Sequence, residues 1–543
     1  MLTAGRHGAR RRRGGLRFGH GHGRRIPLLR IAAVVLLAAL GAGGLLWRAH
    51  VHARDDRRAA ALRFVRAWEH LDHAAMWRAL TPAARAATPQ AAFAAHYRRA
   101  ERAAGVATVR AGTVSKERGG SIRVRVVVTL RDFHSLRGTV ALPVSGSAEK
   151  AGVDWRAQLR LPGLRAGEAV SRRAGAAPRR ASVLAADGTR LDATALGASI
   201  AGVAEPAPTG LQRVYDARLG GHPSERLLFG RRVVARTPAL RGRSVRTTLR
   251  PGLMGAAHTA LGGKLGGVAV VRPRDGSVLA LAGLAVSAPQ PPGSTFKIIT
   301  LSAALEHRLA TPSTAFPLAT FATLSGVKLG NASGERCGGT LTQAFVESCN
   351  SVFAPLGAKV GATRLVRTAR AFGFGETPQI PAAKPSSISP PEELRDDLAV
   401  GAAAIGQDRD LATTLEMATV GATIATGGRR ARPRVATLEP VVRHRAISAA
   451  TAHQVRAMML EVVRSGTGTA AAIPGVQVAG KTGTAELRPN SKDPKDADAW
   501  FVAFAPARSP RVAVAVMLVG AGFGGTAAAP IARRVLQAAL GAA

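Results

Sequence analysis

The segment "STFK" has the clearest chemical meaning in this sequence, because Ser294 precedes Lys297 by three positions. A serine hydroxyl is a weak nucleophile that needs a base within hydrogen-bonding reach. If a helix begins at Gly293 or Ser294, Lys297 lies one turn later on the same face, with its amine near the serine oxygen. A helix start, burial and a second cation would each lower the pKa of the lysine. The pair therefore predicts a nucleophile and a neutral base.

Two further segments supply groups that acyl transfer needs. "SCN", from Ser348 to Asn350, offers a hydroxyl that relays a proton and an amide that holds a substrate carbonyl. "KTGT" follows an apolar strand and presents a cation, two hydroxyls and a glycine that permits close backbone approach, on Lys481, Thr482, Gly483 and Thr484. A peptide carboxylate would bind to the cation and the hydroxyls. In this order, the three segments predict one site.

The three motifs S-x-x-K, S-x-N and K-T-G resemble those of the serine penicillin-binding transpeptidases and of the related serine beta-lactamases. The surrounding text "PPGSTFK", "SCNSVFAPLG", "FGFG", "AIGQ" and "VAGKTGTAE" is also similar to this family. The likeness covers about residues 240 to 540. It is to the class B type, whose members have a high molecular weight and no glycosyltransferase domain.

The resemblance implies a D,D-transpeptidase that acts on peptidoglycan stem peptides. Ser294 would be acylated by the D-alanyl-D-alanine end while Lys297 takes its proton, and the amides of Ser294 and Thr484 would form the oxyanion hole. Ser348 would pass a proton to the leaving D-alanine. The resemblance makes Asn350 a peptide-holding residue, and it assigns the terminal carboxylate to Lys481, Thr482 and Thr484. Beta-lactams would be covalent inhibitors, a glycosyltransferase would be a partner, and neither metal nor organic cofactor is expected.

Two other functions use the same residues. Water in place of an amine would make the site a D,D-carboxypeptidase or a beta-lactamase, and "PPEELRDDL" contains carboxylates that could activate water: Glu392, Glu393, Asp396 and Asp397. The alternative for these carboxylates is an acidic loop before a helix, which we favour. A catalytically dead scaffold or beta-lactam sensor is the second alternative, although all the side chains required for catalysis are present.

Length and composition predict several domains and no nucleic-acid partner. The chain has 543 residues, of which 46% are hydrophobic, and this exceeds what one ordinary core requires. The formal net charge of +43 comes from basic residues along the whole chain, and only 4% of residues are aromatic. Stacking platforms for bases are therefore scarce. The arginine excess is typical of a G+C-rich genome.

The N-terminal region predicts attachment to the cell membrane. Residues 1–30 form a basic tail, and the uncharged residues 31–47 are about long enough to cross a bilayer as a helix. The arginines place the tail in the cytoplasm and the rest of the chain outside. A cleaved signal peptide is the alternative, because Val51 and Ala53 would suit a cleavage site. Cys337 and Cys349 could then form a disulfide, or remain two buried thiols.

The remaining pattern predicts a multidomain α/β (α+β) protein. A helical stretch over residues 60–80 is followed by strands at 121–130, 138–146 and 153–161, which indicates a small α+β domain over 53–164. This domain resembles the nuclear-transport-factor-two-like domain of some penicillin-binding proteins. Residues 165–235 read as a connecting, dimerisation-like subdomain.

The catalytic domain is expected over residues 240–543. A hairpin at 266–282 and three strands near the C-terminus surround a long helical region, and residues 530–540 form a closing amphipathic helix. Strands at both ends of a domain indicate one antiparallel sheet covered by helices. All three motifs would then belong to the same domain.

Overall fold

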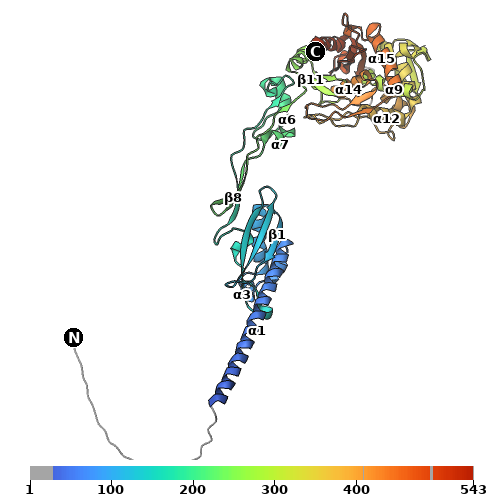
Figure 1. Cartoon of the computed structure of the whole chain (residues 1–543). Helices are drawn as coiled ribbons and strands as arrows, with labels where there is room; N and C mark the ends of the chain where they lie inside the picture. Colours follow the sequence, from blue (N-terminus) through green and yellow to red (C-terminus); the bar gives the residue numbers. More distant parts are fainter. Residues whose placement is uncertain (1–27, 408, 489–492, 542–543) are drawn as a thin grey trace, which may run out of the picture. The chain divides into compact units, whose positions relative to one another are not determined.

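The computed structural model describes residues 28–407, 409–488 and 493–541 (Figure 1). A few side chains within these ranges are not described, and most of them belong to residues 28–46. Contacts divide the chain into two compact units. Unit 1 contains the chain up to Ala176 and the segment Pro223–Pro238, and unit 2 contains Ala177–His222 and everything from Ala239 on. The segment 165–235, which the sequence predicts to be one connecting subdomain, is therefore shared between the two units.

Unit 1 is an α+β structure in which helices cover an antiparallel sheet. The strand order of the main sheet is β1-β2-β3-β4, and a second sheet has the order β5-β7-β8. The helices are α1 (Leu28–Glu69), α2 (His73–Arg78), α3 (Pro82–Ala87) and α4 (Gln90–Ala104). The strands are β1 (Val106–Val114), β2 (Ser121–Leu130), β3 (Leu136–Ser145), β4 (Gly152–Val153), β5 (Val170–Ala174), β7 (Glu225–Phe229) and β8 (Arg232–Thr237).

Alternating residues of β2 are buried against the helices, which is what the period-two pattern of "SIRVRVVVTL" predicts. The core includes the aromatic rings of Trp68 and Tyr97, whose centroids lie 6.3 Å apart in an edge-on arrangement. Unit 1 thus has α+β architecture, and its division as a domain over residues 53–164 stays a prediction. Its specific likeness to the nuclear-transport-factor-two-like domain stays a prediction.

Two expectations for unit 1 are wrong in detail. The helical stretch 60–80 is interrupted at Leu71, which has a positive φ of 54°, and Asp72 then caps the new helix α2. The expected strand 153–161 ends after Val153, and a 3₁₀ turn follows at Ala157–Arg160. The reason is that Val153 bonds to the backbone around Leu80, so the chain leaves the sheet there.

The predicted membrane span lies near the start of α1. Residues 1–27, which hold most of the expected cytoplasmic tail, lie outside the described residues. Within the part of the chain that the structure does describe, no helix combines the length and the apolar character needed to cross a bilayer. Most side chains of residues 31–47 are not described, so the span stays a prediction.

Unit 2 contains the predicted catalytic domain. Its helices are α5 (Ala195–Ala201), α6 (Gly210–Val214), α7 (Asp216–Gly220), α8 (Pro251–Leu261), α9 (Lys297–Glu306), α10 (Leu341–Val346), α11 (Asn350–Val360), α12 (Ala362–Phe372), α13 (Asp397–Ala404), α14 (Thr414–Ala425), α15 (Ala449–Arg464), α16 (Gly524–Ala527) and α17 (Ala529–Gly541). The strands of its main sheet are β10 (Gly266–Arg272), β11 (Ser277–Gly283), β18 (Ala479–Glu486), β19 (Ala497–Ala505) and β20 (Val512–Leu518). Shorter strands are β6 (Val183–Leu184), β9 (Val245–Arg246), β12 (Ala315–Ala319), β13 (Phe321–Leu324), β14 (Val327–Gly330), β15 (Cys337–Thr340), β16 (Arg429–Ala431) and β17 (Arg443–Arg445).

The main sheet of unit 2 is antiparallel throughout, with the order β11-β10-β20-β19-β18. Every residue of β20 is buried, so both faces of the sheet are covered. Helix α14 packs against β10, β19 and β20, and α17 packs against β19 and β20. The expected hairpin at 266–282, the three C-terminal strands and the closing helix are confirmed. Strand β18, which carries "KTGT", is an end strand of the sheet.

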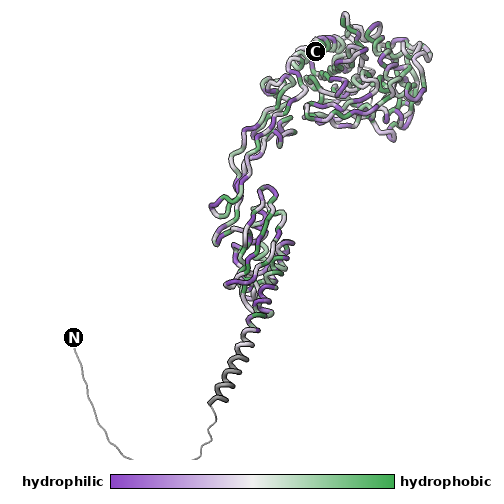
Figure 2. Tube along the Cα trace, viewed as in Figure 1, coloured by the Kyte–Doolittle hydropathy of each residue, from purple (hydrophilic) through white to green (hydrophobic). Residues whose placement is uncertain are grey.

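Hydrophilic residues occur throughout the described part of the chain. Figure 2 shows them spread over both units rather than gathered in one segment.

Candidate active site

Ser294 lies in a short 3₁₀ segment, η4 (Gly293–Phe296), which leads directly into α9. Gly293 has a φ of +50°, and a Cβ atom there would lie only 2.5 Å from the carbonyl oxygen of Thr484 on β18. Its amide donates a hydrogen bond of 2.9 Å to the carbonyl of Gly406, within the "AIGQ" segment. A glycine is therefore required for the nucleophile segment to approach the edge strand this closely.

Lys297 is completely buried at the start of α9. Its amine donates to the carbonyl oxygen of Ser348 and to Oδ1 of Asn350, both at 2.7 Å, and lies 3.4 Å from the Ser348 hydroxyl. Burial, and secondarily the charge of Lys481, lower the pKa of Lys297 well below its ordinary value. This shift favours the neutral amine, which is the form that a general base requires.

The structure does not join Ser294 to Lys297 by a hydrogen bond. The serine is half-buried, and its hydroxyl has no hydrogen-bond partner in the described part of the chain. The proximity of the Lys297 amine to the Ser294 oxygen therefore stays a prediction, because the lysine bonds to Ser348 and Asn350 instead. Catalytic hydrogen bonds often form only when a substrate is bound.

Ser348 lies in the connection between α10 and α11, with a φ of 68° that non-glycine residues rarely adopt. This conformation turns the chain back after α10, where the Cys349 amide bonds to the carbonyl of Ala344 at 2.9 Å. The hydroxyl of Ser348 accepts a hydrogen bond of 2.8 Å from the Lys481 amine. Ser348 therefore lies between the two lysine amines, and strained backbone of this kind is found mainly at functional sites.

The Lys481 side chain extends to this serine from β18, the end strand of the sheet. Its amine also donates to the carbonyl of Thr482 at 3.1 Å and lies 5.5 Å from the centre of the Phe345 ring. The side chain is fully buried, and this desolvation lowers the pKa of Lys481 to about 7. Two buried amines around one hydroxyl form a group that can exchange a proton near neutral pH.

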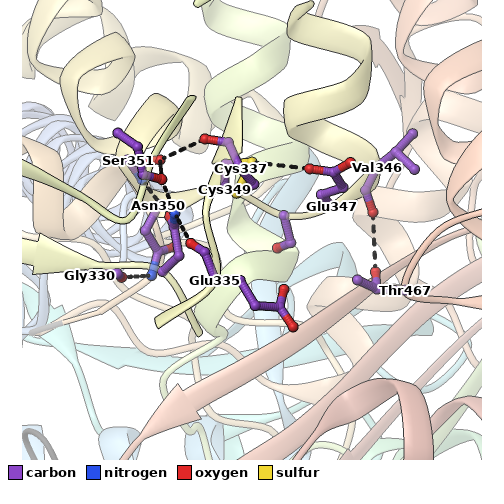
Figure 3. The surroundings of a disulfide bond; sticks show 12 residues. Gly330, Glu335, Cys337, Val346, Glu347, Cys349, Asn350, Ser351 and Thr467 are labelled. Carbon is purple, nitrogen blue, oxygen red and sulfur yellow. Dashed lines mark hydrogen bonds between the residues drawn. A yellow bond between two sulfur atoms is a disulfide. The ribbon is translucent and has the colours of Figure 1, made fainter. Parts of the chain in front are cut away.

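A disulfide fixes the "SCN" segment to strand β15. It joins Cys337 to Cys349, the residue between Ser348 and Asn350, so the structure selects this alternative over two free thiols (Figure 3). The Asn350 amide group donates to the carbonyl of Gly330 at 2.8 Å. The start of α11 is thus tied both to β15 and to the end of β14.

The other residues of "KTGT" also belong to β18. Gly483 lies against the nucleophile segment, because a Cβ atom there would be 2.9 Å from the carbonyl oxygen of Pro292. The Thr484 hydroxyl accepts a hydrogen bond of 3.4 Å from the Gly524 amide. The Thr482 hydroxyl lies 2.7 Å from that of Thr467, a residue that the sequence prediction missed. The glycine-rich text "SGTGT" around Thr467 is the signal that could have indicated it.

The acidic segment before α13 has structural roles. The Asp396 side chain caps α13 by accepting from the amide of Ala399 at 2.8 Å. Glu393 pairs with Arg409 at 2.9 Å, and both side chains are largely exposed. These contacts support the interpretation of an acidic loop leading into a helix.

Comparison with known proteins places these residues in a family. Residues 266–537 match the model of the penicillin-binding protein transpeptidase domain. The peptidoglycan D,D-transpeptidase PbpA of Mycobacterium tuberculosis is 35% identical over 407 residues, which cover 61% of this chain and 79% of the relative. Stage V sporulation protein D of Bacillus subtilis is 32% identical over 276 residues, which cover 46% of this chain and 42% of the relative.

Solved structures give the same result. Penicillin-binding protein A of M. tuberculosis, solved as a ceftriaxone acyl-enzyme complex, superposes with a TM-score of 0.57 at 29% identity, covering 67% of this chain and 99% of that one. The D,D-transpeptidase domain of a peptidoglycan glycosyltransferase from Eggerthella lenta gives a TM-score of 0.59 at 30% identity, covering 68% and 99%. The matched region contains all three motifs and the two buried lysines. The chain therefore belongs to the penicillin-binding protein transpeptidase family.

Proposed function

We propose that this protein is a peptidoglycan D,D-transpeptidase, which crosslinks stem peptides through a serine acyl-enzyme and is acylated by beta-lactams. The observation that carries the proposal is the pair of buried amines of Lys297 and Lys481 around Ser348, next to the segment that holds Ser294. Such a centre can accept and return a proton without a metal or a histidine.

In the first step, Ser294 Oγ attacks the carbonyl carbon of the D-alanyl-D-alanine peptide bond and neutral Lys297 takes the hydroxyl proton. The oxyanion is held by the amides of Ser294 and Thr484, and removal of one such donor typically lowers the rate by about 10² to 10³. The carbon–nitrogen bond then breaks, and the leaving D-alanine receives a proton through Ser348. This leaves a Ser294 ester of the stem peptide.

In the second step, the amine of another stem peptide attacks the ester carbonyl. The new peptide bond forms as the bond to Ser294 Oγ breaks. The attacking amine gives up one proton to neutral Lys297, which returns it to the serine oxygen. The donor peptide would lie along β18, with Asn350 holding its backbone and with its terminal carboxylate bound by Lys481, Thr482 and Thr484, while Gly483 allows close approach.

The proposal is tested by mass spectrometry of the purified protein after treatment with benzylpenicillin. We expect one adduct on the peptide that contains Ser294, with slow loss over time, and no adduct in Ser294→Ala. Rapid release of hydrolysed penicillin would identify a hydrolase instead. If Ser294→Ala restored growth to a strain lacking the protein, a non-enzymatic role in wall synthesis would replace the proposal.

We further propose that unit 2 works outside the cytoplasm, with the N-terminus inside and residues 31–47 in the membrane. The disulfide at Cys337 supports this location, because such bonds persist in oxidising compartments. The substrate lies there as well, and a glycosyltransferase partner would supply its glycan strands. Alkaline phosphatase fused after residue 52 should be active in cells, and an inactive fusion would contradict the orientation.

A further inference from the structure

The loop after α15, residues 465–469, connects two parts of the active site. The Thr467 hydroxyl lies 2.7 Å from that of Thr482 on β18. The same hydroxyl lies 3.4 Å from the carbonyl oxygen of Val346, the last residue of α10, which precedes the "SCN" segment (Figure 3). Thr467 therefore spans the space between the strand that carries the third motif and the helix that leads into the second.

Close backbone contacts fix the position of this loop. A Cβ atom at Gly466 would lie 2.5 Å from the Val346 side chain, so this residue must be glycine for the loop to approach α10. The amide of Gly468 bonds to the carbonyl of Val462 at 3.0 Å. On the opposite side, a Cβ atom at Gly525 would lie 2.5 Å from the carbonyl oxygen of Thr467. The backbone of Thr467 is thus held in place by α10, α15 and α16 together.

The two hydroxyls differ in their surroundings. The Thr482 side chain is only 6% exposed, whereas Thr467 is exposed. Each hydroxyl has one proton to donate, and the pair has one acceptor beside it, the Val346 carbonyl. In the free protein, Thr482 can donate to Thr467, which in turn donates to Val346. If a carboxylate binds at Thr482, the order reverses, because the Thr482 proton is then needed for the carboxylate.

We propose that Thr467 is a positioning residue that directs the Thr482 hydroxyl proton toward the carboxylate of the substrate or of a beta-lactam. Thr467 donates its own proton to the Thr482 oxygen, and this leaves Thr482 free to donate to the ligand. Hydrogen bonds in such a chain strengthen one another, since each donor polarises the next. The inference rests on the proposed function, because it requires that the ligand carboxylate binds at β18.

The test compares acylation rates for two ligands that differ only in the carboxylate. The second-order rate constant is measured for benzylpenicillin and for its methyl ester, with the full-length wild-type protein, Thr467→Val and Thr467→Ser. Thr469→Val is the matched control, because Thr469 is an exposed threonine of the same loop. Thr467→Ala serves as a second variant without the hydroxyl, and thermal unfolding checks that each variant is folded.

For Thr467→Val, we expect about a fivefold loss of rate with benzylpenicillin, which is the scale of one hydrogen bond between neutral hydroxyls. The rate with the methyl ester should stay within about twofold of wild type. Thr467→Ser should restore the benzylpenicillin rate. An equal loss with both ligands, or no loss with benzylpenicillin, would overturn the inference and leave the proposed function intact. A wild-type protein that reacts with neither ligand would overturn both.

Discussion

Replacing Lys481 by methionine should make the protein more stable near neutral pH while abolishing its activity. Burial lowers the pKa of Lys481 from 10.5 to about 7, because the interior disfavours the charged form. A shift of this size corresponds to about 4 kcal/mol of destabilisation at pH 7. The variant loses two hydrogen bonds, to Ser348 and to the Thr482 carbonyl, of about 1 kcal/mol each. The net gain expected at pH 7 is therefore about 2 kcal/mol.

The stability gained in Lys481→Met must depend on pH, and the pKa shift fixes the direction of that dependence. The pKa of Lys481 is lower in the folded state than in the unfolded chain, so its penalty is complete below pH 7. As the pH rises from about 7 to about 10.5, the unfolded chain also loses the proton and the penalty disappears. The stability advantage of Lys481→Met should therefore shrink over this range and reverse at its upper end, where only the lost hydrogen bonds remain.

The assay is thermal unfolding of the wild type and of the variant at several values between pH 7 and pH 10.5. For a unit of this size, 2 kcal/mol corresponds to a rise in Tm of about 3 °C at pH 7. Lys264→Met is the control, because Lys264 is exposed in a turn and should give the same small difference at every pH. A difference between Lys481→Met and wild type that is constant across the pH range would refute the reasoning.

Three further predictions test other parts of the site. Replacing Cys337 and Cys349 together by alanine should cost unit 2 about 3 kcal/mol in urea unfolding, since the bond closes a loop of sequence separation 12; unchanged midpoints would contradict this. Gly293→Ala should lower the acylation rate by at least about 100-fold, because the added Cβ would meet Thr484 and displace the nucleophile segment; a labelled penicillin and circular dichroism separate this from unfolding. Asp396→Ala should cost about 1 kcal/mol through loss of the α13 cap and leave the acyl-enzyme lifetime unchanged; a longer lifetime would give this carboxylate a role in hydrolysis.

The sequence predicts those parts of the candidate site whose residues lie close together in the chain. "STFK" contains both the proposed nucleophile and the proposed base. "KTGT" was expected at the end of an apolar strand over 476–480, but β18 begins only at Ala479 and contains the whole motif. The partners of Lys297 could not be predicted, because Ser348 and Asn350 reach it through the turn at Ser348, whose positive φ no pattern in "SCN" indicates. Thr467 was missed for the same reason, since only the fold brings it to β18.

For the fold as well, contacts between neighbouring segments could be predicted, whereas contacts between segments far apart in the sequence could not. The hairpin β10–β11 follows from two apolar runs around a turn, and it forms as predicted. The position of β20 between β10 and β19 depends on pairing across more than two hundred residues, which hydropathy alone does not determine. Likewise, β7 and β8 return to pair with β5 in unit 1, so the segment 165–235 did not form one subdomain.

The place of β18 at the end of the sheet has a consequence for how the protein behaves at high concentration. Sheet edges are commonly protected from other chains by outward charges, of which lysine is the most frequent. The lysine of β18 is instead buried against Ser348, so its charge does not protect this edge. An edge kept open for a peptide is also open to extended segments of misfolded neighbours, so self-association through this strand should rise when beta-lactams are absent and fall when one occupies it.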